Sequence, residues 1–64
     1  MKKAKIIWFD RLKGFGEAEL LNKTKTFLHH RAFSKPEQTF KLKSGVKILV
    51  DLHKDGHVYK AKIS

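Results

Sequence analysis

The chain has 64 residues, no cysteine and a formal net charge of +9. A chain this short forms one domain with a thin core, and the lack of cysteine excludes disulfides and thiolate metal sites. No apolar run reaches the roughly 20 residues of a membrane span, and the apolar part of the basic N-terminal segment is too short for a signal peptide. We therefore expect residues 1–64 to form a single soluble, cytoplasmic, monomeric domain without a cofactor.

The charge balance indicates the class of partner. Fifteen lysines and arginines stand against six acidic residues. Such an excess attracts polyanions and releases their counterions on binding. For a basic domain of this size, nucleic acid is the first partner to consider, and no membrane partner is expected.

Three short strands are predicted in the first half of the chain. Residues 5–12 are rich in β-branched and aromatic side chains, which favours a strand. Residues 15–21 alternate in part and form the second. Residues 22–24 read Asn-Lys-Thr, which suits a hairpin turn, and residues 25–30 form the third strand.

The second half begins with a long connection. Residues 34–45 are mostly polar and hold the only proline, so we expect a loop with a short helical turn. Residues 46–52 alternate strictly, which is typical of a half-buried antiparallel strand. Asp55-Gly56 is a strong hairpin signal. It leads into a fifth strand at residues 57–63, where we expect Tyr59 to share its side with Ala61 and Ile63.

Five short strands with one long connection predict an all-β fold. A small sheet must close or be covered, because free edges invite aggregation. The pattern fits a five-stranded antiparallel Greek-key β-barrel of the OB type. An SH3-like barrel remains open as an alternative.

An aromatic patch is expected on the outside of this barrel. If Ala18 and Leu28 point inward, then Phe15, Phe27 and His29 point outward from neighbouring strands. Exposed rings beside lysines are suited to stacking on bases, at about 1–3 kcal/mol per base. The glycines on either side of Phe15 leave its ring accessible. The alternative is that these rings cap one end of a small core.

The side on which Trp8 lies stays open, because residues 6–9 read IIWF and are apolar on both sides of a strand. Trp8 joins the ring patch only if it points outward.

Two stretches resemble a known family. IIWFDRLKGFG at residues 6–16 and TFLHHRAF at residues 26–33 resemble the cold-shock domain of bacterial cold-shock proteins and Y-box proteins. The family's motifs have the form Lys-Gly-Phe-Gly-Phe-Ile and Val-Phe-Val-His-Phe. The resemblance is strong over residues 5–33 and loose afterwards. It implies an OB-type barrel that binds single-stranded nucleic acid.

The resemblance also implies roles for individual residues. A tryptophan, two phenylalanines and a histidine match stacking positions, one lysine matches a phosphate contact, and a second phenylalanine matches a position that is partly core and partly rim. These residues are Trp8, Phe15, Phe27 and His29 for stacking, Lys13 for phosphate, and Phe9 at the rim.

Three residues depart from the family pattern. Glu17 replaces a central phenylalanine, His30 replaces another, and Ile7 replaces the usual lysine before the tryptophan. Glu17 removes one stacking platform and adds a negative charge. It has two readings: it pairs with Lys13, Lys25 or Lys3, or it marks a surface for a protein partner. His30 can still stack and gains attraction for phosphate when protonated, so it is kept among the candidate binding residues.

The predicted function is binding of single-stranded RNA or DNA through surface rings and lysines, with low sequence specificity and RNA-chaperone activity as a consequence. The alternative is a protein-interaction or ribosome-associated OB domain that has lost tight nucleic-acid binding. No enzyme is expected, because the sequence has no nucleophile, phosphate-loop or zinc-ligand pattern. The adjacent histidines His29 and His30 are predicted on opposite faces. His53 and His57 leave a metal site open as a minor alternative.

Overall fold

The structure is a computed structural model that describes residues 1–64 apart from the side chain of Pro36. Over this described chain, the structure has one antiparallel sheet of five strands and no α-helix. Two short 3₁₀ segments lie in the connection between the third and fourth strands. The strands are β1 (Lys2–Asp10), β2 (Phe15–Leu20), β3 (Lys25–His29), β4 (Lys47–Leu52) and β5 (Val58–Ile63). The 3₁₀ segments are η1 (His30–Ala32) and η2 (Pro36–Lys41). All five predicted strands are confirmed, and η2 is the helical turn expected in the long connection.

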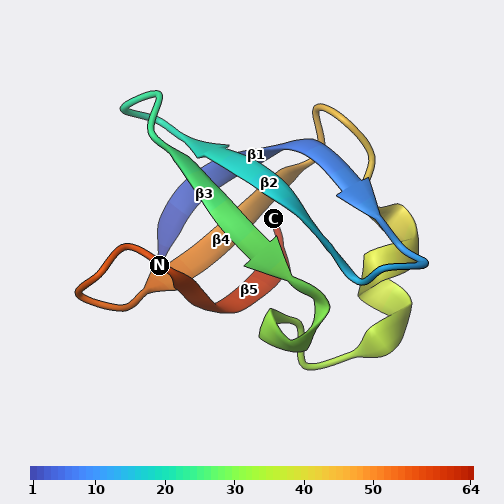
Figure 1. Ribbon diagram of the computed structural model, residues 1–64. Helices are drawn as coiled ribbons and strands as arrows, with labels where there is room; N and C mark the ends of the chain where they lie inside the picture. The colour runs from blue at the N-terminus through green and yellow to red at the C-terminus, as the bar shows by residue number, and fades with distance from the viewer.

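The sheet curls strongly into a half-barrel (Figure 1). Its strand order is β3-β2-β1-β4-β5, and β1 pairs with β2 over most of its length but with β4 only from Lys2 to Lys5. The curl brings the edge strands toward each other: the Thr26 hydroxyl donates a hydrogen bond to the Gly56 carbonyl at 2.9 Å, and Phe33 forms a parallel bridge with Ala61. The architecture is consistent with a small β-barrel.

Alternating side chains fill the inside of the curl. Ile6, Leu28, Ile48 and Val50 are fully buried, and the burial of Leu28, Ile48 and Val50 is as the alternation of their strands predicts. Alanines from three strands lie among them, which lets the walls of so small a sheet approach each other. The buried hydrophobic residues are Ala4, Ile6, Ala18, Leu28, Ala32, Phe33, Leu42, Ile48, Val50 and Ala61.

A bulge in β1 decides how its apolar run is divided. Ile6 lies opposite Ala18 and Trp8 lies opposite Glu17, so Ile7 is an extra residue without a partner on β2. The extra residue shifts the alternation by one. Ile6 therefore points inward while Trp8, two residues later, points outward.

A second bulge lies in β5 and corrects a prediction. Leu52 pairs with Val58 and Asp51 with Lys60, so Tyr59 is the extra residue. Val58 and Ala61 both turn to the core, and Tyr59 is 49% exposed. The expectation that Tyr59 shares its side with Ala61 is wrong, because the bulge reverses the alternation between them.

Both predicted hairpin turns are confirmed. Lys23 has φ 67° between β2 and β3, where the Thr24 amide donates to Asn22 Oδ1 at 3.0 Å. Between β4 and β5, Gly56 has φ 91° and the His57 amide donates to Asp55 Oδ1 at 3.0 Å. Separately, no helix in the described part of the chain is long and apolar enough to cross a membrane.

Candidate functional site

The outward side chains of β1, β2 and β3 form a regular array. The register places directly opposed residues in three successive rows across the strands. The rows are Lys5, Glu19 and Lys25, then Trp8, Glu17 and Phe27, then Asp10, Phe15 and His29. Opposed Cβ atoms lie about 4.5–5.5 Å apart in such pairs, so each row is a set of direct neighbours. We call Trp8, Phe15, Glu17, Phe27 and His29 the aromatic face.

Three rings of this face are linked by two contacts, both of which involve the half-buried Phe15. The ring centroids of Trp8 and Phe15 lie 5.9 Å apart in an edge-to-face arrangement, and those of Phe15 and Phe27 lie 5.7 Å apart and nearly parallel. Trp8 is 40% and Phe27 48% exposed, and none of the three rings belongs to the core cluster. The predicted outward patch is therefore present, Trp8 belongs to it, and the alternative that these rings cap the core is wrong.

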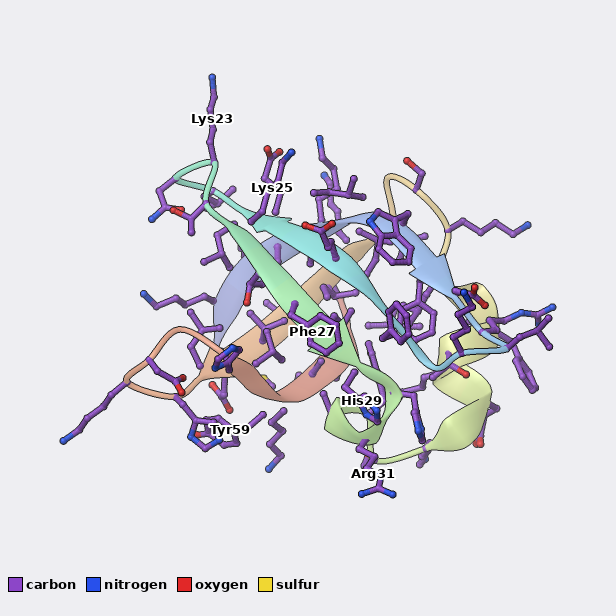
Figure 2. All side chains as sticks on the ribbon, in the orientation of Figure 1. Lys23, Lys25, Phe27, His29, Arg31 and Tyr59 are labelled. Atoms are coloured by element: carbon purple, nitrogen blue, oxygen red, sulfur yellow. The ribbon has the colours of Figure 1, made fainter. Side chains whose placement is uncertain are left out.

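Side chains along β3 continue this surface toward both ends of the strand. Figure 2 shows Lys25, Phe27 and His29 following one another on the same side of β3, with Lys23 beyond them at the hairpin tip. Lys23 and Lys25 are exposed. A line of cationic and aromatic groups therefore runs along the outer strand.

The glycines around Phe15 have a structural role that the sequence did not reveal. A Cβ on Gly16 would lie 2.2 Å from the Trp8 carbonyl oxygen and 2.7 Å from Phe9 Cα, because the β1 bulge brings that backbone against β2. Gly14 has φ 78°, and a Cβ there would meet the His30 ring. Close backbone packing therefore requires glycine at position 16, and a positive φ beside the His30 ring favours glycine at position 14, whatever the accessibility of Phe15.

Glu17 lies in the middle row of the face, between Trp8 and Phe27. The indole Nε1–H of Trp8 donates a hydrogen bond to Glu17 Oε1 at 3.1 Å. No ion pair joins Glu17 to Lys3, Lys13 or Lys25 anywhere in the described chain. The expected lysine pairing is thus replaced by a bond to the neighbouring ring, which holds both side chains in place.

The two adjacent histidines lie together, which corrects the prediction of opposite faces. Their ring centroids are 4.4 Å apart. β3 ends at His29 and η1 begins at His30, so the alternation of a strand no longer applies between them. The Arg31 amide donates to His29 Nδ1 at 3.2 Å. Loss of solvent contact, and then the nearby His30 and Arg31, lower the pKa of His29 from its ordinary 6.5.

The remaining predicted residues lie outside the aromatic face. Lys13 is exposed in the β1–β2 turn, whose backbone is fixed by the Leu12 and Lys13 amides donating to Asp10 Oδ1. Phe9 turns inward and packs against the core. Lys13 therefore lies in solvent at the end of the β1–β2 hairpin, whereas Phe9 packs on the core side of the sheet.

Two further contacts of exposed aromatic rings were not predicted from the sequence. Tyr59 stacks on His53 with centroids 4.4 Å apart, and the Arg11 guanidinium lies 5.1 Å from the centroid of the Phe40 ring. Figure 2 shows Tyr59 beside the β4–β5 hairpin, away from Phe27. The signal for Tyr59 was the spacing of Val58 and Ala61, two core residues that are three positions apart and therefore imply a bulge.

The histidines of the β4–β5 hairpin have local partners. His57 Nδ1 lies 3.0 Å from Asp55 Oδ2, and hydrogen bonds from the His57 backbone and side chain lower the pKa of Asp55. His53 is stacked on Tyr59. Among the described residues, no group of three or more histidine and carboxylate side chains is placed to hold a metal ion.

Comparison with known proteins gives no relative: neither a protein-family model nor a curated protein matches this sequence.

Proposed function

We propose that this protein binds single-stranded RNA or DNA on its aromatic face. The observation that carries the proposal is the ring set on the outside of a basic barrel, in which the exposed Trp8 and Phe27 both contact the half-buried Phe15. Rings left outside the core gain little from folding, whereas each base that stacks on such a ring contributes about 1–3 kcal/mol. Unpaired bases offer the flat faces that this surface can cover.

The cationic groups complete the proposed interface. Lys13 lies at one end of the face, and Lys23 and Lys25 at the other, so phosphates of a strand crossing the rings would meet lysines at both ends. Each phosphate neutralised on a single strand adds about −0.7 to the slope of log affinity against log salt. Most of the strand would then be bound through its backbone with little sequence preference.

The barrel that we propose as the scaffold is of the OB type with Greek-key connections. In support, β1 pairs with both β2 and β4, and the edge strand β3 is hydrogen-bonded through Thr26 to Gly56 in the hairpin that leads into β5. The resemblance of residues 6–16 and 26–33 to the cold-shock domain points the same way. A chaperone activity would follow, because a protein that binds only unpaired bases shifts hairpins toward their open form by mass action.

A second candidate rests on Glu17. A carboxylate in the middle of an anion-binding surface opposes phosphate, and this favours a protein-interaction or ribosome-associated role for the same face. The two candidates differ in what they bind: the first requires a strand of unpaired bases, and the second does not.

Calorimetric titration separates them. We expect the chain to bind short oligothymidine and oligouridine, to bind a duplex of equal length more weakly, and to lose affinity steeply from low to high salt. Equal affinity for duplex and single strand, or affinity that does not change with salt, would contradict the proposal. Absence of any binding, with co-sedimentation on ribosomes, would favour the second candidate.

A further inference from the structure

Two carboxylates on β2 point to the same side of the sheet but have opposite surroundings. Glu19 lies between Lys5 and Lys25, so cations flank its charge on both sides. Glu17 lies between Trp8 and Phe27 and has no cation as a direct cross-strand neighbour. A charge placed among rings is costly unless polar groups satisfy it. The Trp8 indole supplies one donor, at 3.1 Å from Oε1, and the carboxylate can accept further bonds.

The Trp8 bond also orients the carboxylate. Because Oε1 is held toward β1, the Glu17 side chain is fixed beside the rings on which bases would stack. Phe27 is directly opposite Glu17, and Phe15 is two residues before it on the same strand. A base lying flat on either ring would therefore present its edge to Glu17.

The bases differ in the donors and acceptors of their Watson–Crick edge, which is the edge that we take them to present to Glu17. Guanine carries two neighbouring donors, N1–H and the N2 amino group. Adenine and cytosine offer one amino donor beside a ring-nitrogen acceptor, and uracil and thymine offer one N–H between two carbonyl acceptors. An ionised carboxylate only accepts hydrogen bonds. It therefore matches the two adjacent donors of guanine, which no other base offers on this edge.

We propose that Glu17 is a specificity-determining residue that reads one guanine in the bound strand by accepting hydrogen bonds from N1–H and N2–H. The inference rests on the proposed function and sharpens it: the strand is held by stacking and phosphate contacts, and one position is selected. The negative charge at the centre of the face then has a role in recognition, since it favours the one base whose edge carries two adjacent donors.

The test changes single functional groups, first on the nucleic acid and then on the protein, and compares the affinities. Short oligothymidines carrying one guanine, inosine or adenine at each position in turn are titrated against the wild-type chain. Inosine lacks only the N2 amino group, so it removes one of the two donors. At the best position we expect guanine to bind about 5- to 150-fold more tightly than thymine. Inosine should be weaker than guanine by about three- to tenfold.

Glu17→Gln is the decisive variant, and Glu19→Gln is its matched control. Both remove one negative charge from the same side of β2, so their effect on general phosphate attraction is comparable. Glutamine at position 17 can still accept the Trp8 N–H but offers one donor and one acceptor, which suits adenine. We expect Glu17→Gln to abolish the difference between guanine and inosine and to favour adenine, while Glu19→Gln retains the guanine preference.

The outcomes separate this inference from the proposed function. Equal binding of guanine, inosine and thymine strands by the wild type would overturn the guanine reading and leave strand binding intact. The same would hold if Glu17→Gln and Glu19→Gln changed all affinities by the same factor. Failure of the wild type to bind any of these strands would overturn the proposed function, and the guanine reading with it.

Discussion

Two β-bulges bring a ring to the surface of this small sheet, and they differ in what surrounds that ring. The bulge at Ile7 in β1 turns Trp8 outward, and the bulge at Tyr59 in β5 exposes Tyr59 itself. Trp8 meets Phe15 edge to face and is hydrogen-bonded to Glu17. Tyr59 stacks on His53 alone. A bulge can thus expose a ring against the regular alternation, but only neighbouring strands can turn that ring into part of a face.

The β1 bulge also requires glycine at position 16, because Gly16 of β2 packs directly against the bulged backbone. The Cβ of Gly16→Ala would lie 2.2 Å from the Trp8 carbonyl oxygen, so the backbone of β1 or β2 must move. We expect a loss of at least about 3 kcal/mol of unfolding free energy. A chain of this size has roughly 3–5 kcal/mol in total, so the variant would keep at most about 2 kcal/mol of its stability.

Urea unfolding followed by circular dichroism measures this loss. Gly45→Asn is the control, because Gly45 has a positive φ, which Gly16 does not, and no atom lies within 4 Å of the position of its Cβ. It should cost about 1 kcal/mol, from backbone strain alone. A Gly16→Ala variant as stable as the control would show that the close approach at the bulge is not required.

The next prediction concerns binding, and it compares the aromatic face with the surface around Tyr59. Phe27 and Tyr59 are exposed to nearly the same extent, 48% and 49%, so Phe27→Ala and Tyr59→Ala should perturb folding equally little. Phe27→Ala should weaken binding of a short oligonucleotide by about 5- to 150-fold, the value of one base stack. Tyr59→Ala should change it less than about twofold. Comparable losses in calorimetric titration would mean that the strand path includes the β4–β5 hairpin.

The smallest effect is a pH dependence centred on His29. Its pKa in the folded chain lies below 6.5, so below that pH the unfolded chain binds the proton more readily. The stability contributed by neutral His29 is therefore complete above pH 6.5 and is lost as the pH falls through the lower, folded value. Replacement by glutamine should flatten that part of the stability profile. An NMR titration of the ring with a midpoint at or above 6.5 would contradict this.

Local patterns were enough to predict most of the fold. Alternation in residues 46–52 identified β4, and the Asn22 and Asp55-Gly56 signals located both tight turns, because these features depend on a few consecutive residues. The outward positions of Phe15, Phe27 and His29 followed from the same alternation.

The facing of Trp8, Tyr59 and His30 could not be predicted from alternation, because at these positions a bulge or a strand end interrupts it. The bulges at Ile7 and Tyr59 are set by pairing with neighbouring strands, so neither the side of Trp8 nor that of Tyr59 was fixed by its own strand. His30 was misplaced because β3 ends one residue earlier. The bond between Trp8 and Glu17 joins residues nine positions apart and required the register.

The position of Trp8 has a practical consequence. It is the only tryptophan of the chain, so all indole emission originates from the aromatic face. A base stacked on the ring would quench that emission, and rupture of the bond from Nε1 to Glu17 would change its wavelength. The protein thus carries its own optical reporter, which registers occupancy of the surface and the state of its central carboxylate without any added label.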